Sequence, residues 1–307
     1  MAEVKISMVK NDGSTFYGRS WPVDKPTANI VILTGMEEHT GRYNDFAQFL
    51  NNQGYSVFSL DYYGQGMNVE VGEQKLGCVP ESAFRKFIYT IDELVQKLRA
   101  SSVPIYLIGH SMGSFMLQDY AQRFGKHVDK IVLTGTNGPM FTAKLGYLIA
   151  RMTVTKKSYD KKSKLLAALA IGSYQKSVKN HKDINEWISF NPDNVAAYTA
   201  DPLAGKGSSK GFYREFLKGL NRLYRKKFLA KIEKDFPILI LAGAEDPVGG
   251  KGQGIKKLVD VYQKQGLKNV EHKLYTNMRH EILNEVGKEE VYQDIATFLK
   301  KDFKEQK

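Results

Sequence analysis

Short apolar runs alternate along most of this chain with longer segments whose apolar residues recur at helical spacing. The expected strands span residues 30–33, 56–60, 105–108, 131–133, 237–241 and 270–275, and the expected helices span 43–53, 84–98, 112–124, 254–265 and about 289–303. Short apolar strands that alternate with helices form a mostly parallel sheet whose two faces are covered by those helices. The sequence therefore predicts the α/β fold class, with ligands bound at the carboxyl ends of the strands.

The alternation follows an expected β-hairpin and is interrupted once. Residues 4–9 and 15–21 alternate in polarity around the turn residues Asn11-Asp12-Gly13, which indicates an antiparallel edge. Residues 137–230 are lysine-rich and helix-like, without a convincing strand and with loop signals at Asn191-Pro192 and at residues 205–211. We therefore expect residues 1–136 and 231–307 to form one sheet of about eight strands, with residues 137–230 inserted as a helical block.

The composition is that of an ordinary globular protein. Hydrophobic residues make up 42% of the 307 residues and charged residues 25%, and the single cysteine, Cys78, excludes an intrachain disulfide. The sequence does not open with a basic segment followed by an apolar one, and no apolar run approaches the ~18 residues of a membrane span. We expect a cytoplasmic protein.

The segment Gly109-His110-Ser111-Met112-Gly113 has the G-x-S-x-G pattern of a nucleophile elbow. It follows an expected buried strand and opens an expected helix, whose first N–H groups favour the negative charge that develops during acyl transfer. Ser111 is therefore the candidate nucleophile, with helix capping as its alternative role. A second match, Gly207-Ser208-Ser209-Lys210-Gly211, lies in a polar stretch with no strand before it and is interpreted as a flexible loop.

A nucleophilic serine needs a base within hydrogen-bond reach, and the base needs a carboxylate that orients it. After such an elbow the partners follow in the order Asp or Glu, then His. Among the later histidines, His181 lies in the inserted block and His272 in an alternating strand, where a histidine faces solvent by default. His280 instead follows the strand 270–275 in a loop at the carboxyl edge of the sheet. We expect His280 to be the base.

Two further roles complete the expected site. Asp246 follows the strand 237–241 and precedes Pro247, which favours an extended conformation, so we expect Asp246 to orient the base. Its neighbour Glu245 is the alternative, although its side chain should point the other way. An oxyanion hole needs a backbone donor beside the N–H of Met112, usually from the loop after the third strand. That loop is Thr34-Gly35-Met36-Glu37-Glu38-His39, and we expect the N–H of Met36 to be the donor.

Other motifs do not indicate a different chemistry. The cluster Gly249-Gly250-Lys251-Gly252-Gln253-Gly254 could suggest phosphate binding, but it lacks the G-K-[ST] ending and the spacing of a P-loop. Neither an H-E-x-x-H motif nor a cysteine cluster indicates a catalytic metal. We therefore expect no cofactor and no metal.

Together these residues resemble the branch of the α/β-hydrolases that holds monoacylglycerol lipases, bacterial lysophospholipase-like proteins and the serine aminopeptidase S33 group. The resemblance covers nearly the whole chain and also includes Glu38-His39-Thr40-Gly41-Arg42-Tyr43, Asp61-Tyr62-Tyr63-Gly64-Gln65-Gly66, Asp246-Pro247-Val248-Gly249 with Gly250-Lys251-Gly252, Arg279-His280-Glu281-Ile282-Leu283-Asn284-Glu285, Trp187-Ile188-Ser189 and Tyr198-Thr199-Ala200-Asp201-Pro202-Leu203-Ala204-Gly205. It implies the α/β-hydrolase fold, with residues 137–230 as a helical cap over the active site.

Three positions depart from the pattern of that family. Thr34 stands where its H-G-x-G motif has histidine, Glu37 where that motif has its second glycine, and Gln65 where its D-x-x-G-H-G motif has histidine. A carboxylate at Glu37 would oppose the developing oxyanion unless it turns away.

The resemblance implies a serine hydrolase that cleaves monoacylglycerols or lysophospholipids through an acyl-enzyme intermediate. A serine aminopeptidase is the alternative enzyme, but it should need an acidic subsite for the substrate amine, which a basic cap does not favour. The alternative of another class is a non-catalytic protein that binds an anionic surface.

The charge of the chain is concentrated in the inserted block. The net charge is +12, and residues 137–230 carry 18 Lys and Arg against 6 Asp and Glu, whereas the rest of the chain is nearly balanced. Residues 164–174 add an apolar patch among lysines, which could face an acyl chain or a membrane interface, or could pack on the sheet. We expect peripheral contact with anionic lipid surfaces or head groups and no nucleic acid, and we make no prediction of the oligomeric state.

Overall fold

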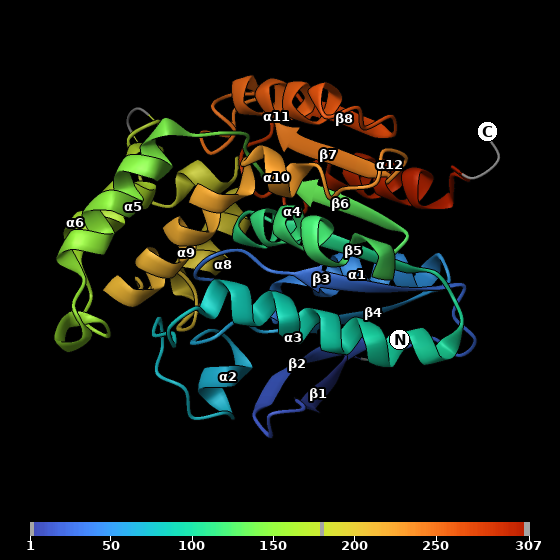
Figure 1. The fold of residues 1–307 in the computed structure, drawn as a ribbon, viewed down its shortest axis with the longest axis horizontal. Coiled ribbons are helices and arrows are strands. Elements are labelled where there is room, and N and C mark those ends of the chain that lie inside the picture. The colour runs from blue at the N-terminus through green and yellow to red at the C-terminus, as the bar shows by residue number, and fades with distance from the viewer. Residues whose placement is uncertain (1–2, 179–180, 304–307) are drawn as a thin grey trace.

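The computed structural model describes residues 3–178 and 181–303 of the chain. An eight-stranded sheet in the order β1-β2-β4-β3-β5-β6-β7-β8 forms its centre (Figure 1). The strands are β1 (Val4–Val9), β2 (Thr15–Trp21), β3 (Ala28–Leu33), β4 (Tyr55–Leu60), β5 (Ile105–His110), β6 (Lys130–Thr134), β7 (Ile238–Gly243) and β8 (Val270–Tyr275). β2 pairs in antiparallel fashion with both of its neighbours, β1 and β4. All the other neighbouring strands, from β4 across the sheet to β8, are parallel. The predicted α/β class, with its antiparallel edge, is confirmed.

The central strands are apolar because both faces of the sheet are covered. Every residue of β3, β5, β6 and β7 is buried, as is typical of parallel strands between two layers of helices. In register, Leu33 pairs with Gly109 and His110 pairs with Thr134, so these strands end together at one edge of the sheet. The loops that follow them are therefore neighbours.

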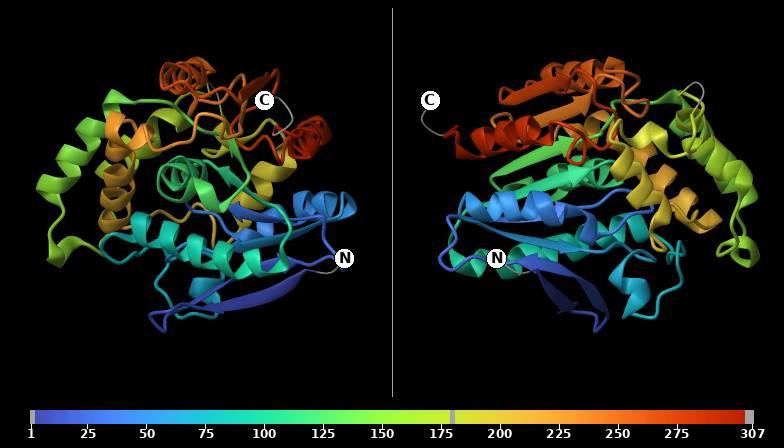
Figure 2. Two further views of the ribbon diagram at one scale, coloured as in Figure 1. Left: turned by 45° about the vertical axis from the view of Figure 1, so that its right-hand side comes forward. Right: turned by 180° about the vertical axis from the view of Figure 1, so that it is seen from behind.

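Helices cover the two faces of the sheet (Figure 2). One face carries α1 (Asn44–Asn52) and α12 (Lys288–Lys300), and the other carries α3 (Ala83–Leu98), α4 (Met112–Phe124) and α11 (Gln253–Lys264). Each of these five helices begins within one residue of its predicted start, and α12 ends before its predicted end. The segment after β4, interpreted from the sequence as a long loop, also contains the short helix α2 (Met67–Glu70).

Helices also make up the segment between β6 and β7, and we call residues 137–230 the cap. Its helices are α5 (Phe141–Thr153), α6 (Lys164–Ala167), α7 (Ser173–Gln175), α8 (Pro192–Ala200), α9 (Lys210–Leu223) and α10 (Lys226–Leu229), with a π-helical turn over residues 168–172. Within the described part of the cap, the one β-bridge joins Lys162 to Ser209. In Figure 1 the cap helices lie to one side of the sheet.

At both loop signals within the cap, the turn-forming residues also cap a helix that begins inside the expected loop, while residues 205–209 themselves lie outside any helix. The side chain of Asn191 accepts a hydrogen bond from the N–H of Asp193 at 3.1 Å, and Pro192 occupies the first turn of α8, where a missing N–H costs nothing. Ser209 likewise accepts from the N–H of Phe212 at 3.2 Å, so α9 begins at Lys210 within the expected loop.

The cap and the sheet share one hydrophobic cluster. Phe212, Leu217 and Leu220 of α9 belong to the same buried cluster as the inner faces of α3 and α4. A Cβ atom added at Gly219 of α9 would lie 2.6 Å from the ring of Phe84 on α3, so the two helices are in close contact. None of the helices within residues 3–178 and 181–303 is both long and apolar enough to span a membrane.

Candidate active site

Ser111 occupies the tight turn between β5 and α4. Its φ of 50° and ψ of −116° form a conformation that residues other than glycine seldom adopt. A Cβ atom at Gly109 would lie 2.7 Å from the backbone of Gly113, and one at Gly113 would collide with the carbonyl of Leu33. Both glycines are therefore needed for the strand, the turn and the helix to pack. The strained turn presents Ser111 at the carboxyl edge of the sheet.

His280 and Asp246 form a buried pair in the loops after β8 and β7. Nδ1 of His280 lies 3.1 Å from each carboxylate oxygen of Asp246, and the two residues are 3% and 0% exposed. Asp246 also accepts a hydrogen bond from the N–H of Val248 at 2.8 Å. Glu245 instead faces solvent, where it pairs with Lys251 at 2.8 Å. The structure thus brings Asp246, and not Glu245, to the imidazole.

The surroundings of His280 favour its protonated form. Burial by itself would lower the pKa of His280, but the charge of Asp246 and its hydrogen bond outweigh burial and raise the pKa above its ordinary value. The neighbouring His110, whose ring centroid lies 4.7 Å from that of His280, behaves in the opposite way. Burial, reinforced by the charge of His280, lowers the pKa of His110 to about 3. His110 is therefore neutral near pH 7, whereas His280 can take up a proton.

The alternative candidates from the sequence lie outside this cluster. The side chains of His181 and His272 are exposed. Ser209, in the second G-x-S-x-G match, is the N-cap of α9. That match is therefore the start of a helix rather than an elbow.

The loop after β3 lies directly against Ser111. A Cβ atom at Gly35 would be 3.2 Å from Cβ of Ser111. The carbonyl of Gly35 accepts a hydrogen bond from Nε2 of Gln65 at 3.1 Å. In a trans peptide the C=O and the following N–H point in opposite directions, so Gln65 turns the N–H of Met36 away from itself. Met36 and Met112, the two expected oxyanion donors, both line the same cavity as Ser111.

Gln65 fixes this loop with every hydrogen-bonding atom of its side chain. Nε2 also donates to the carbonyl of Glu38 at 2.8 Å, and Oε1 accepts from the N–H of Glu37 at 2.9 Å. The sequence showed Gln65 as a departure from the family pattern but gave no role for it. Its role depends on the contact between the loop after β4 and the loop after β3, and a linear sequence motif does not show that contact.

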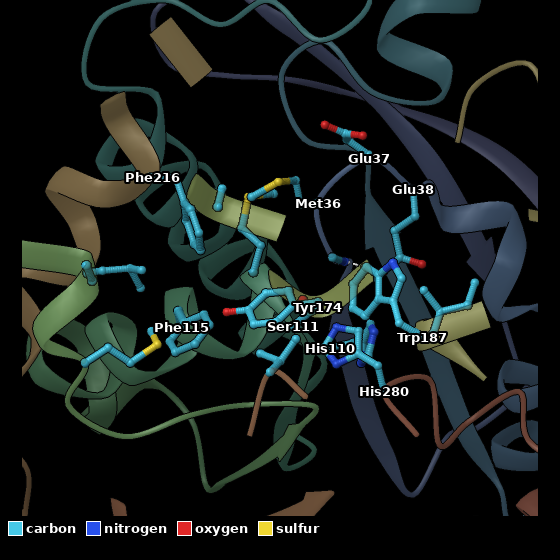
Figure 3. A pocket seen from close by; sticks show the side chains of 18 of the residues that line it. Met36, Glu37, Glu38, His110, Ser111, Phe115, Tyr174, Trp187, Phe216 and His280 are labelled. Carbon is cyan, nitrogen blue, oxygen red and sulfur yellow. Dashed lines mark hydrogen bonds between the residues drawn. The ribbon is translucent and has the colours of Figure 1, made fainter. Parts of the chain in front are cut away.

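The carboxylate of Glu37 turns away from the nucleophile. Figure 3 shows it directed away from Ser111, and it accepts hydrogen bonds from the N–H of Gly207 at 3.1 Å and from Oγ of Ser208 at 2.8 Å. The charge of Glu37 therefore faces the cap, and the expected conflict with an oxyanion does not arise in this geometry.

A buried ion cluster, which sequence reasoning did not single out, lies beside His280. Arg42 binds both carboxylate oxygens of Glu281 at 2.7 Å and contacts Glu38 at 3.1 Å and Asn194 of the cap at 2.9 Å. Burial raises the pKa of Glu38. Burial would also raise the pKa of Glu281, but the charge and hydrogen bonds of Arg42 outweigh it and lower that pKa to about 2. Arg42 and Glu281 each lie in a segment that resembles the family pattern, but the sequence of neither segment shows that the two side chains form an ion pair.

Ser111, His110 and His280 lie at the base of a mostly apolar cavity. The cavity has a volume of about 110 Å3 and opens to solvent. Its walls include aromatic and aliphatic residues from the core and the cap: Met36, Met112, Phe115, Met140, Leu169, Tyr174, Trp187, Ile188, Phe216, Leu217 and Leu220. In Figure 3, Trp187 lies by His280 while Phe115 and Phe216 lie at the opposite end. Such a cavity suits an apolar chain whose reacting group reaches Ser111.

The apolar patch of residues 164–174 is divided between interior and surface. Leu166 is buried in the shared core, whereas Leu165 and Leu169 are 61% and 48% exposed. Leu169 and Tyr174 also line the cavity. The segment therefore both packs inward and contributes to the cavity wall.

Comparison with known proteins finds a matching family model and several similar proteins. The family model described as serine aminopeptidase, S33 matches residues 24–287. The monoglyceride lipase homolog of monkeypox virus is 26% identical over 298 residues, which cover 95% of this chain and 96% of that protein. Phospholipase YtpA of Bacillus subtilis is 26% identical over 283 residues, which cover 91% of this chain and 97% of that protein.

Solved structures share the fold. A thermostable carboxyl esterase from Bacillus coagulans, in complex with glycerol, superposes with a TM-score of 0.88 at 24% identity, over 97% of this chain and 98% of that one. A soluble variant of the monoglyceride lipase from Saccharomyces cerevisiae gives a TM-score of 0.75 at 20% identity, over 97% and 94% of the two chains. At these identities the likeness concerns the fold alone.

Proposed function

The chain belongs to the serine aminopeptidase S33 family, and we propose that it is a serine hydrolase that cleaves monoacylglycerols or lysophospholipids with Ser111, His280 and Asp246 as its catalytic residues. The observation that carries the proposal is the strained turn at Ser111. Ser111 lines an apolar cavity together with His280, and Nδ1 of His280 contacts the buried carboxylate of Asp246. The curated relatives named monoglyceride lipase and phospholipase support the substrate class.

In the first half of the reaction, Oγ of Ser111 attacks the acyl carbon while Nε2 of His280 takes its proton. Asp246 holds Nδ1–H, which fixes the tautomer and stabilises the imidazolium. The carbonyl oxygen becomes an oxyanion and accepts hydrogen bonds from the N–H groups of Met36 and Met112. When the tetrahedral intermediate collapses, the bond to the alcohol oxygen breaks and that oxygen takes the proton from Nε2.

In the second half, water replaces the alcohol. His280 removes a proton from the water, the hydroxide attacks the acyl carbon, and the ester bond to Ser111 breaks as Oγ regains a proton from His280. The products are a fatty acid and the free enzyme.

The acidic residues of the cavity favour an ester over an aminopeptidase substrate. An aminopeptidase needs a carboxylate that can bind the ammonium group of its substrate. The carboxylates that line this cavity belong to Glu37, Glu38 and Glu281. Glu38 and Glu281 are paired with Arg42, and Glu37 is bound by the cap. None of these three is left to bind an amine.

The outer face of α5 supports peripheral contact with a lipid surface. Phe141, Leu145, Leu148 and Met152 lie on one helical face and are between 50% and 79% exposed. The opposite face packs on α9, where a Cβ atom at Gly146 would lie 3.3 Å from Leu217. Figures 1 and 2 show α5 at the edge of the molecule with α9 between it and the sheet. An apolar stripe beside the cationic segment 156–164 fits an anionic lipid interface, the surface predicted from the charge of the cap.

A substrate panel tests the proposed activity. A monoacylglycerol, a lysophospholipid, a short p-nitrophenyl ester and an aminoacyl p-nitroanilide would be compared by kcat/KM, with Ser111→Ala as the blank for each. We expect a lipid ester to be the best substrate. A higher kcat/KM for the aminoacyl anilide would favour the aminopeptidase, and no hydrolysis of any substrate would favour a non-catalytic binding protein.

A further inference from the structure

The cap is hydrogen-bonded to the oxyanion loop at two residues: Nε2 of His39 lies 2.7 Å from a carboxylate oxygen of Asp201, and the larger set of contacts is made by Glu37. Its carboxylate accepts hydrogen bonds from the N–H of Gly207 at 3.1 Å, Oγ of Ser208 at 2.8 Å and the hydroxyl of Tyr213 at 3.2 Å. All three donors lie in residues 207–213, at the start of α9. We call this set of contacts the Glu37 latch.

The backbone of Glu37 is held at the same point. Its carbonyl accepts from the N–H of Gly205 at 2.9 Å and from the hydroxyl of Tyr198 at 3.2 Å, both in the cap. Its φ of 59° lies in the left-handed region, where a residue with a side chain is strained unless its surroundings hold it. The cap supplies much of what holds Glu37 in this conformation.

The Glu37 latch lies next to the backbone N–H of Met36, which must point at the oxyanion. The N–H of Met36 belongs to the peptide between Gly35 and Met36, and Glu37 is the next residue in the chain. On one side, Gln65 and Glu38 hold Gly35 through its carbonyl and its N–H. On the other side, the cap holds Glu37. If the cap released Glu37, Gln65 would still hold the Gly35 carbonyl and the Glu37 N–H. The carbonyl and carboxylate of Glu37 would lose their partners, however, so its strained backbone, and with it the direction of the Met36 N–H, would be held less firmly.

We propose that Glu37 is a positioning residue that makes the oxyanion hole depend on the cap: the Met36 N–H is held firmly in its direction while residues 205–213 lie on Glu37, and less firmly when they move away. The proposal rests on the function proposed above and adds a control to the same site. Opening of the cap admits substrate, and its return completes the hole that stabilises the transition state. The second G-x-S-x-G match thereby acquires a role, because its Gly207 and Ser208 bind the latch carboxylate.

Single-group substitutions test the latch. Ser208→Ala and Tyr213→Phe each remove one hydrogen-bond donor to Glu37, and Glu37→Gly removes the carboxylate while suiting a positive φ. Tyr159→Phe is the matched control, because the hydroxyl of Tyr159 joins the cap to the carbonyl of Pro80 at 3.2 Å without touching the oxyanion loop. For each variant, kcat and KM for a short soluble ester, the rate constant of inactivation by a fluorophosphonate and the thermal midpoint would be measured.

We expect Glu37→Gly to lower kcat and the inactivation rate constant about ten- to hundredfold, less than the loss of a whole oxyanion donor. Ser208→Ala and Tyr213→Phe should each lower both about two- to tenfold, with KM unchanged. Tyr159→Phe should leave both at the wild-type value even if its thermal midpoint falls. In the Glu37→Gly background, adding Ser208→Ala should change nothing further, because its partner is gone.

Two results would overturn the proposal. One is wild-type kcat and inactivation rate in Ser208→Ala and Tyr213→Phe, and the other is an equal effect of Ser208→Ala with and without Glu37. Failure of the proposed function is distinguishable, because the wild-type protein itself would then not react with the fluorophosphonate.

Discussion

Asp246 and Glu245 are adjacent in the chain, yet their carboxylates lie in opposite environments: Asp246 is buried against His280, and Glu245 is paired with Lys251 at the surface. The pair supplies an internal control for the role of the buried carboxylate. Substitution of each residue by its amide changes the same charge at nearly the same point in the sequence.

Asp246→Asn should lower kcat about 10⁴-fold, because an amide at this point favours the wrong tautomer of the base. Glu245→Gln should leave kcat within about twofold, since exposed ion pairs contribute little. The hydrolysis of a short soluble ester measures both. Equal losses in the two variants would contradict the assignment of Asp246.

The pH dependence of kcat/KM should report the titration of His280. The base must be neutral in the free enzyme, and Asp246 raises the pKa of His280. Activity should therefore fall as the pH drops through a value above about 6.5, the ordinary pKa of histidine. His110, with its pKa of about 3, should add no step between about pH 5 and pH 9. In Asp246→Asn the acid limb should move to lower pH. A limb that stays in place would show that another group titrates.

Arg42→Met should lower the free energy of unfolding by about 3–5 kcal/mol, because it leaves the carboxylates of Glu38 and Glu281 buried without their partner. The contrasting variant is Lys126→Met, which breaks an exposed pair with Glu233 at 3.5 Å. It should change stability by less than about 0.5 kcal/mol. Urea unfolding measures both, and a similar change in the two variants would show that the buried cluster contributes no more than a surface pair.

Phe141→Ser with Met152→Ser should weaken binding to vesicles of anionic phospholipid, because it removes the most exposed apolar side chains of α5. Val9→Ser, at the distant β1 hairpin, is the control for loss of an exposed apolar residue. Co-sedimentation with anionic and with neutral vesicles, at low and at high salt, separates the apolar and ionic contributions. Equal binding of the wild type to both kinds of vesicle at low salt would contradict a role for the charge of the cap.

The sequence was most informative where local chemistry decides the structure. The apolar runs of β3, β5, β6 and β7 predicted buried strands because a two-sided parallel sheet leaves few positions for polar residues. The Ser111 turn could be predicted because its glycines and flanking elements are contiguous. Asp246 and His280 could be predicted because each follows a recognisable strand.

Contacts between distant segments could not be predicted in this way. Gln65 and Glu37 were visible as departures from a pattern, but their hydrogen bonds depend on how β4 and the cap meet the loop after β3. The bidentate contact between Arg42 and Glu281 likewise joins residues far apart in the chain. Within the cap, the starts of α8 and α9 after Asn191 and Ser209 were not predicted, because capping residues and turn residues are chemically the same.

The central claim is that Ser111 is the nucleophile, and covalent labelling tests it most directly. A fluorophosphonate would be incubated with the wild type, with Ser111→Ala and with Ser209→Ala, and the modified peptide would be identified by mass spectrometry. We expect one label per chain, on the peptide that contains Ser111, in the wild type and in Ser209→Ala, and none in Ser111→Ala. A label on any other residue, or labelling that persists in Ser111→Ala, would contradict the account.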